Sequence, residues 1–161
     1  MSGSLTFSVE LLADHPQLVP AVGEMRWREW GHAPEPESLD WWVNITGREA
    51  GREHLPVTWV AIDAQGYAVG AVGLGKFDIE ERRDRSPWVL GMIVHSERRR
   101  LGVGSALMRC LEGWAREHGY ASAWVATGGR AVDFYRKCGW QLTETLERAS
   151  GEVMSVLVKK L

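Results

Sequence analysis

Residues 88–104 read Trp-Val-Leu-Gly-Met-Ile-Val-His-Ser-Glu-Arg-Arg-Arg-Leu-Gly-Val-Gly, and this stretch decides the fold. Residues 88–94 are apolar and rich in bulky and β-branched side chains, which favours a strand buried on both faces. From Val103 onward apolar residues recur at helical spacing, and Gly119 stands where a left-handed cap would end the helix. The predicted inner face of this helix carries Val103, Leu107, Leu111, Trp114, Ala115 and His118, and the outer face carries Ser105, Arg109, Glu112 and Arg116.

The turn between this strand and this helix is crowded with arginine and glycine. A helix N-terminus leaves backbone N–H groups unpaired and carries partial positive charge, so it favours a bound anion. Gly102 and Gly104 remove side chains that would keep a phosphate away from those donors, and Arg99 and Arg100 add fixed positive charge. The sequence therefore predicts a turn that binds a pyrophosphate.

Two segments of the chain resemble one enzyme family. Residues 99–104, Arg-Arg-Leu-Gly-Val-Gly, fit the Arg/Gln-x-x-Gly-x-Gly/Ala signature of the GNAT-type N-acetyltransferases. Residues 131–140, Ala-x-x-Phe-Tyr-x-x-x-Gly-Trp, are similar to the Ala-x-x-Phe-Tyr-x-x-x-Gly-Phe segment of that family. The resemblance implies that acetyl-CoA binds at the turn. It also implies transfer of the acetyl group to a primary amine of a small molecule or peptide, by direct attack within a ternary complex.

The resemblance also assigns the contacts to acetyl-CoA. Backbone groups at the positions of Met92 and Val94 would meet the pantetheine amides and the oxyanion that develops on the acetyl group. The residues that would hold the pyrophosphate are Arg99, Arg100, Gly102, Gly104 and Ser105. Gly128 stands where the family often has an asparagine that touches the cofactor, so this one contact is missing here.

The departing thiolate needs an acid, and the attacking amine must lose a proton. Tyr135 matches the tyrosine that often serves as the acid in the family, and a phenol with a pKa near 10 is protonated at neutral pH. Some members carry a basic glutamate where Trp88 stands here, and an indole cannot accept a proton. Asp78, after a predicted strand, is the first candidate for the base, although such a residue also suits a turn. His32 is the second candidate, and relay by water is a third alternative.

Four of the nine tryptophans, at positions 27, 30, 41 and 42, are close together in the sequence. Most of the nine are expected in the core, since large aromatic side chains dominate core packing. In the resembling family, the first two helices and the loop between them border the acceptor substrate. The resemblance therefore predicts acceptor contacts from Trp30, His32 and Trp41, with Glu35, Glu37 and Trp42 nearby. Asp78, the candidate base, is expected to contact the acceptor as well. Cation–π contacts at tryptophan would suit a cationic amine.

The remaining pattern predicts an α/β protein with one domain over residues 1–161. Its expected sheet is mixed and mostly antiparallel, with helices on its flanks. The expected strands are 5–11, 57–62, 67–76, 88–94, 121–126, 140–146 and 153–158, and the expected helices run from Asp14 to Gly31 and over 38–50, 103–118 and 130–138. Three glycines, at 70, 73 and 75, indicate a bulge or a close approach of another group to their strand. The charged run 78–86 predicts a solvated hairpin tip.

Composition limits the remaining choices. A net charge of −2 provides no general basic field for nucleic acid or an anionic membrane. No apolar run approaches the roughly 20 residues of a membrane span, and no signal peptide pattern is present, so we expect a cytoplasmic protein. Cys110 and Cys138 are expected to be free thiols, and no spacing of His, Cys and carboxylates predicts a metal site. Members of the resembling family often form homodimers.

Two other functions remain open from the sequence. The first is an acyl-CoA binding or sensing domain without catalysis, which Trp88 and Gly128 favour and the retained Tyr135 opposes. The second is a nucleotide-binding protein that uses residues 102–104. It is the weaker alternative, because the third glycine of a dinucleotide fingerprint would fall at Leu107 and no Gly-Lys-Ser/Thr phosphate loop is present.

Overall fold

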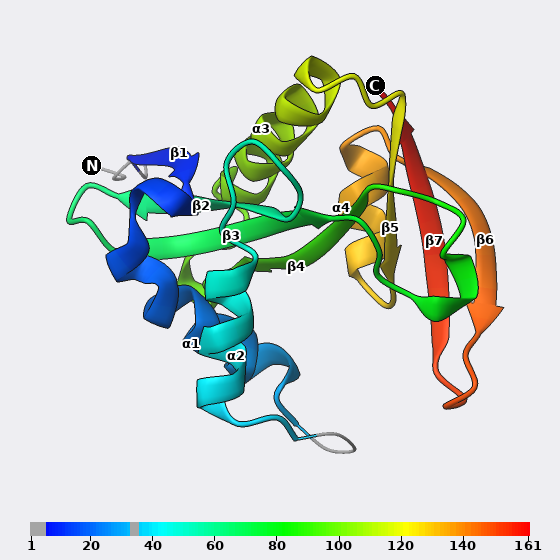
Figure 1. The fold of residues 1–161 in the computed structure, drawn as a ribbon, viewed down its shortest axis with the longest axis horizontal. Helices are drawn as coiled ribbons and strands as arrows, with labels where there is room; N and C mark the ends of the chain where they lie inside the picture. The colour runs from blue at the N-terminus through cyan, green and yellow to red at the C-terminus, as the bar shows by residue number, and fades with distance from the viewer. Residues whose placement is uncertain (1–5, 33–35) are drawn as a thin grey trace. The chain divides into compact units, whose positions relative to one another are not determined.

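The computed structural model of the chain describes residues 6–32 and 36–161 (Figure 1). Its strands are β1 (Phe7–Leu11), β2 (Val57–Asp63), β3 (Ala68–Gly75), β4 (Trp88–Val94), β5 (Ser122–Thr127), β6 (Gln141–Glu147) and β7 (Val153–Lys160). Its α-helices are α1 (Val19–Trp30), α2 (Leu39–Arg48), α3 (Val103–Glu117) and α4 (Ala131–Lys137). Short 3₁₀ turns are η1 (Leu12–Asp14), η2 (Pro16–Leu18), η3 (Glu80–Arg82) and η4 (Ser96–Arg98). This order of strands and α-helices confirms the prediction from the sequence.

The strands form a mixed, mostly antiparallel sheet, as predicted. Hydrogen-bonded neighbours follow the order β1-β2-β3-β4-β5-β7-β6. The pairs β1–β2, β5–β7 and β6–β7 are antiparallel, whereas β4 and β5 pair in parallel at Trp88 and Trp124. The chain divides into two compact units. The first comprises Met1–Gly73 and Gly91–Leu111, and the second comprises Leu74–Leu90 and Glu112–Leu161.

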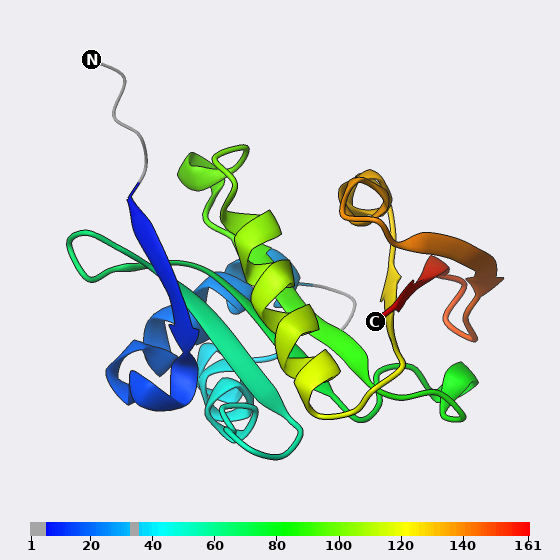
Figure 2. The same ribbon diagram turned by 90° about the horizontal axis from the view of Figure 1, so that it is seen from above.

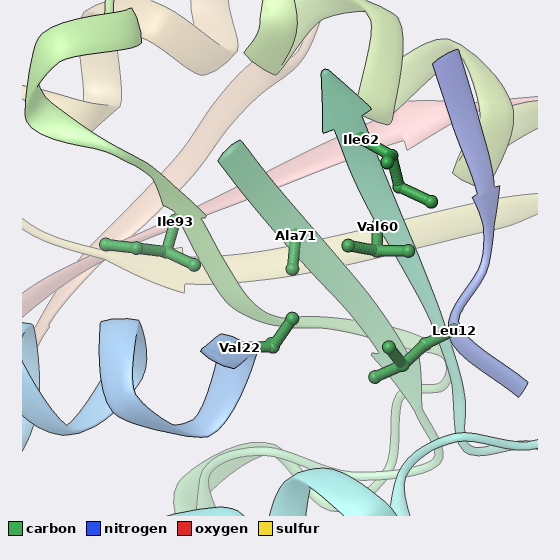
Figure 3. Close-up of a cluster of buried hydrophobic side chains, with 6 residues drawn as sticks. All are labelled: Leu12, Val22, Val60, Ile62, Ala71 and Ile93. Carbon is green, nitrogen blue, oxygen red and sulfur yellow. The ribbon is translucent and has the colours of Figure 1, made fainter. Parts of the chain in front are cut away.

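Helices cover both faces of the strands in the first unit. Figures 1 and 2 show α1 and α2 on one face of β2 and β3, and the beginning of α3 on the opposite face. Every residue of β2 is buried, as cover on both faces requires, whereas β4, the strand predicted to be buried on both faces, is only partly buried. The core beneath α1 consists of Leu12, Val22, Val60, Ile62, Ala71 and Ile93 (Figure 3). This core fixes α1 against β4, the strand that the resemblance assigns to the cofactor.

Gly70 in β3 lets α3 approach the sheet closely. A Cβ built on Gly70 would lie 3.0 Å from Cγ1 of Val103 and 3.1 Å from the carbonyl oxygen of Ile93. Gly75, in the second unit, would likewise collide with Cδ1 of Leu90 if it carried a side chain. Both positions confirm the prediction of a close approach. Because Gly70 has no side chain, the start of α3 can lie close to β3.

Most of the predicted inner face of α3 is buried, but the faces predicted for Glu112 and His118 are wrong. Glu112, expected on the outer face, is only 8% exposed, while His118, expected on the inner face, is exposed and stacks on Trp114 at 3.8 Å. Glu112 accepts a hydrogen bond from Nε1 of Trp140 at 3.3 Å and pairs with Nζ of Lys159 at 3.3 Å. These partners come from a later part of the chain, so the helical period of α3 could not reveal them.

The helix ends are set by capping and proline. Ser38 caps α2, because its Oγ accepts a hydrogen bond from the backbone N–H of Trp41 at 3.1 Å, as predicted. The predicted cap of the first helix at Asp14 is wrong, since Asp14 ends η1 and α1 begins at Val19. The reason is Pro20, whose missing N–H cannot bond to a carbonyl four residues earlier in a helix that starts at Asp14.

The charged segment before β4 is held by ion pairs within the second unit. Nε of Arg82 lies 2.5 Å from Oε1 of Glu144, and Nε of Arg148 lies 3.1 Å from Oε2 of Glu81. Both partners come from β6 or from the turn that follows it. Within the predicted solvated tip, Glu80, Arg83 and Asp84 are exposed, whereas Glu81 and Arg82 are half-buried by their ion pairs. The charge run tethers the segment between β3 and β4 to the β6–β7 hairpin.

Candidate functional site

The predicted pyrophosphate turn has the geometry of an open helix N-terminus. Arg100 and Gly102 are in the left-handed region, with φ of 67° and 85°, and α3 begins directly afterwards. The first helical hydrogen bond runs from the N–H of Ala106 to the carbonyl of Gly102 at 3.1 Å. The N–H groups of residues 103–105 precede that bond, so they have no acceptor within the helix. The predicted ligands Gly104 and Ser105 thus supply two of the available donors.

The space beside Gly102 is open. A Cβ built on this residue would have no heavy atom of the described chain within 4 Å. Its left-handed backbone also favours glycine, because other residues pay a steric penalty there. Backbone and space together make this the point at which a ligand can come closest to the first turn of α3.

The three consecutive arginines have different partners. Arg98 lies 3.5 Å from the buried carboxylate of Asp63, which also accepts hydrogen bonds from the turn between β2 and β3. Nε of Arg99 donates to the carbonyl of Val94 at 3.3 Å, and its Nη2 lies 3.9 Å from Glu29. Arg100 is exposed. Arg98 therefore anchors the turn, and the predicted ligands Arg99 and Arg100 present charge at its surface.

Gly91 lies inside β4, just before the two predicted backbone contacts. It has a φ of 54°, in the left-handed region that favours glycine. Met92 and Val94 follow it and are half-buried. The two predicted backbone contacts therefore come after a left-handed glycine of the strand.

Arg26 packs against Gly91, a contact that the sequence did not predict. Its side chain is 1% exposed, and its Nε donates to the carbonyl of Gly91 at 3.2 Å. Its Nη1 donates to Oγ1 of Thr46 at 3.3 Å and to Oε1 of Glu49 at 3.0 Å. One signal was available, since Arg26 stands four residues after Val22 on the apolar face of α1.

Burial dominates the electrostatics of this pair. Burial lowers the pKa of Arg26, and the nearby carboxylate of Glu49 opposes that shift. Burial also raises the pKa of Glu49, which the guanidinium opposes in turn. Among the described residues, Nη2 of Arg26 has no hydrogen-bond partner. The guanidinium is thus only partly satisfied within the protein.

Three of the four clustered tryptophans meet at the end of α1 and the start of α2. Trp30 stacks on Trp42 with ring centroids 6.1 Å apart, and Trp41 meets Trp42 edge to face at 5.1 Å. Trp30 and Trp41 are 41% and 44% exposed. The indole N–H of Trp42 is buried and has no partner in the described part of the chain. The structure therefore brings the two predicted acceptor residues together in one exposed aromatic cluster.

His32 lies just after the end of α1. It is exposed, and its Nε2 lies 2.6 Å from the carbonyl oxygen of Arg28. A carbonyl only accepts hydrogen bonds, so Nε2 carries the proton and Nδ1 remains the basic nitrogen. Glu35, predicted nearby, lies outside the described residues.

Tyr135 and Asp78 both belong to the second unit. Tyr135 is 3% exposed and meets the rings of Phe134 and Trp140 edge to face at 5.1 and 5.8 Å. Burial raises the pKa of Tyr135, and the nearby Cys138 and Asp78 raise it further. Asp78 itself is exposed, beyond the end of β3. The phenol therefore stays protonated throughout the neutral range, with a carboxylate within electrostatic reach.

Two residues near the predicted site have structural roles. Trp88 is fully buried and its Nε1 donates to the carbonyl of Arg85 at 2.7 Å. Nδ1 of His95 accepts a hydrogen bond from the N–H of Glu97 at 3.3 Å, so His95 caps the short turn η4. Cys110 and Cys138 are thiols and form no disulfide bond in the described ranges of the chain.

Comparison with known families decides the relationship. A model described as the Acetyltransferase (GNAT) family matches residues 17–140. The chain belongs to this family. The match spans the turn at Arg100 and Gly102, the left-handed Gly91 and the predicted acid Tyr135. A search of curated proteins gave no match.

Solved structures show that the chain has the GNAT acetyltransferase fold. An aminoglycoside 6'-N-acetyltransferase complexed with coenzyme A is 16% identical, covers 95% of this chain and 96% of its own, and has a TM-score of 0.76. A GNAT acetyltransferase from Streptococcus pneumoniae is 15% identical over 97% and 99% of the two chains, with a TM-score of 0.72. A spermidine N-acetyltransferase chimera from Vibrio cholerae and hSSAT is 17% identical over 98% and 96%, with a TM-score of 0.68.

The residues of this GNAT chain fit the diphosphate of a coenzyme A molecule. The open space at Gly102, the donors at the start of α3 and the exposed charge of Arg100 all favour an anion there.

In the described ranges 6–32 and 36–161, no group of three or more His, Cys, Asp or Glu side chains could hold a metal ion. None of the helices in these ranges combines the length and apolar character of a membrane span.

Proposed function

We propose that this GNAT protein transfers the acetyl group of acetyl-CoA to a primary amine by direct attack in a ternary complex. The observation that carries the proposal is the turn before α3, where left-handed Arg100 and Gly102 open the first N–H groups of the helix to an anion. Arg99, Arg100, Gly102, Gly104 and Ser105 would hold the pyrophosphate. The thioester supplies the electrophilic carbonyl carbon when it is bound.

Strand β4 would present the backbone contacts for the acyl end. Met92 and Val94 follow the left-handed Gly91, and their backbone groups are assigned to the pantetheine amides and to the developing oxyanion. The carbonyl of Val94 already accepts one hydrogen bond from Nε of Arg99. A carbonyl oxygen has two lone pairs, so it can accept a second hydrogen bond.

Tyr135 would donate a hydrogen bond to the departing thiolate. Burial raises the pKa of this phenol, so it remains protonated at neutral pH. A thiol with a pKa near 8.5 is a stronger acid than such a phenol, so full proton transfer is uphill and a hydrogen bond is the favoured interaction. The raised pKa therefore supports a donor that stabilises the thiolate without losing its proton.

Asp78 would take the proton of the attacking ammonium. It is exposed, so it can pass the proton to water, and it lies close enough to Tyr135 to raise the pKa of the phenol. His32, with Nδ1 as its basic nitrogen, is the second candidate. Separate Asp78→Asn and His32→Gln variants distinguish the two. The variant that lacks the base loses activity most strongly at low pH, where free amine is scarce.

We infer that the acceptor is a cationic small molecule. The exposed faces of Trp30 and Trp41 attract a cation through their ring quadrupoles. Two of the similar structures are named as acetyltransferases of an aminoglycoside and of spermidine, which are both polycationic amines. His32 and Asp78 are further predicted acceptor contacts.

The test is release of coenzyme A thiol from acetyl-CoA in the presence of polyamines, aminoglycosides, amino acids or short peptides. Tyr135→Phe should lose most of the rate and keep the affinity for acetyl-CoA. Tyr67→Phe is the matched control, since Tyr67 is 69% exposed in a turn of the first unit and has no proposed role. Equal rates for Tyr135→Phe and the wild type would remove Tyr135 from the mechanism.

A second candidate function is an acyl-CoA binding domain without catalysis. The observation in its favour is Trp88, which fills the position of the family glutamate and is fully buried. Tight binding of acetyl-CoA without turnover of any amine in the panel would establish this alternative.

A further inference from the structure

Arg26 contacts the peptide group of β4 that the proposed reaction uses. Its Nε donates to the carbonyl of Gly91 at 3.2 Å, and the next atom along the backbone is the amide nitrogen of Met92. The carbonyl of Gly91 and the N–H of Met92 therefore belong to one planar peptide unit. In a trans peptide the two groups point in opposite directions. A guanidinium that holds the carbonyl from the side of α1 aims the N–H away from α1.

Three atoms of the Arg26 guanidinium lie close to Gly91. A Cβ built on Gly91 would lie 2.6 Å from Nε, 2.8 Å from Cζ and 2.9 Å from Nη2 of Arg26. The left-handed backbone of Gly91, with a φ of 54°, and the absence of its side chain both make room for this approach. Hydrogen bonding to a charged donor also polarises the peptide group, which makes the N–H of Met92 a stronger donor.

Stability alone does not account for a buried arginine here. Taking a guanidinium out of water is costly, and apolar residues often replace buried ion pairs without loss of stability. Glu49 and Thr46 satisfy Nη1, whereas Nη2 has no partner among the described residues. Glu49 and Thr46 hold Nη1 while Nε donates to the carbonyl of Gly91, so together these contacts orient the guanidinium against β4 and favour a role in shaping that strand.

We propose that Arg26 is a positioning residue that aims and polarises the N–H of Met92 toward the acetyl carbonyl oxygen. This inference rests on the proposed function, in which the backbone groups of Met92 and Val94 serve the oxyanion and the pantetheine amides, and it assigns the oxyanion to the N–H of Met92. Its chemistry requires only a hydrogen bond: as the amine attacks, negative charge grows on that oxygen, and a fixed N–H stabilises the charge. Arg26 touches neither the substrate nor the reacting atoms.

The test compares Arg26→Met and Arg26→Lys with the wild type. Methionine keeps the length and apolar stem, and lysine keeps the charge but loses the flat, forked donor. Loss of an entire oxyanion donor costs about 10²–10³ in kcat, so we expect Arg26→Met to lower kcat by roughly tenfold to a hundredfold. KM for the amine should stay within about threefold, because the tryptophan cluster is unchanged. Lysine should restore part of kcat.

Thr46→Val is the matched control. It removes one hydrogen bond of Arg26 and leaves the bond to Gly91 intact, so a purely structural role predicts similar losses in both variants. The proposal predicts near wild-type kcat for Thr46→Val. Equal kcat in Arg26→Met and the wild type, or equal losses in Arg26→Met and Thr46→Val, would overturn it. If Arg26→Met does not fold, the same comparison is made with Arg26→Lys.

A readout without turnover separates this inference from the proposed function. The amide proton of Met92 is followed by NMR as acetyl-CoA is added to the wild type and to Arg26→Met. A large shift in the wild type and a small one in the variant supports the positioning role even if no amine is acetylated. Equal shifts in both proteins overturn it, as does absence of any shift in the wild type.

Discussion

Replacing Gly102 with alanine should weaken coenzyme A binding far more than it destabilises the fold. Gly102 has a φ of 85°, and a Cβ built there meets no heavy atom of the described residues within 4 Å. Gly119, at the other end of α3, has a φ of 82° and equally open surroundings. Gly119→Ala is therefore a matched control with the same backbone strain on the same helix.

The two effects differ in size. A left-handed backbone costs a residue with a Cβ about 1–2 kcal/mol, so both variants should lose that much unfolding free energy. For a chain of this length each kcal/mol corresponds to roughly 2–4 °C in Tm. Only the methyl group at Gly102 stands beside the first N–H groups of α3. Each lost hydrogen bond to a charged phosphate costs about 1.5–3 kcal/mol, so Kd for coenzyme A should rise at least about tenfold.

The assay is calorimetric titration of coenzyme A into the wild type, Gly102→Ala and Gly119→Ala, with thermal melts of all three proteins. Similar Tm losses in both variants, with weakened binding only in Gly102→Ala, are expected. Wild-type affinity in Gly102→Ala would refute a diphosphate site at this turn. Equal weakening in both variants would assign the effect to helix stability.

Three further predictions concern Tyr135, Glu112 and the tryptophan cluster. Burial raises the pKa of Tyr135, so its contribution to stability is complete below a pH of about 10 and is lost above that pH by about 1.4 kcal/mol per pH unit. In urea unfolding at alkaline pH, the stability of Tyr135→Phe should therefore fall less steeply with pH than that of the wild type. Equal slopes would contradict this. Glu112→Ala removes the acceptor of the Trp140 indole and the partner of Lys159, so it should lower the free energy of unfolding in urea by about 2 kcal/mol. Glu112→Gln should lose less. A loss within about 0.5 kcal/mol for Glu112→Ala would contradict the buried network. Trp41→Ala should raise KM for a cationic amine by roughly fivefold, with KM for acetyl-CoA unchanged in steady-state kinetics, and unchanged KM for the amine would remove the cluster from the acceptor site.

Local patterns in the sequence predicted the strand before the predicted pyrophosphate turn and the helix after it. The apolar run 88–94 forms β4 with those bounds, and the helical period from Val103 forms α3 up to Glu117. Gly119 ends that helix as predicted, with the N–H of Tyr120 bonded to the carbonyl of Ala115 at 3.0 Å. These features depend on residues close together in the chain, so the sequence carries the full signal.

Features that depend on distant partners could not be predicted in this way. Glu112 is buried because Trp140 and Lys159, much later in the chain, satisfy its carboxylate. Arg26 is buried because Glu49 and the carbonyl of Gly91 meet it in the interior. Its spacing from Val22 is compatible with the apolar face of α1, but no local pattern identifies its partners.

The most direct test of the central claim uses acetyl-CoA with an isotope-labelled acetyl group and the amine panel. Labelled product and free coenzyme A thiol are measured together. Amine-dependent release of thiol, with the label recovered in an amide of the amine, is the expected result. Bound acetyl-CoA with no labelled amide from any amine, or thiol release at the same rate without an amine, would contradict acetyl transfer by this protein.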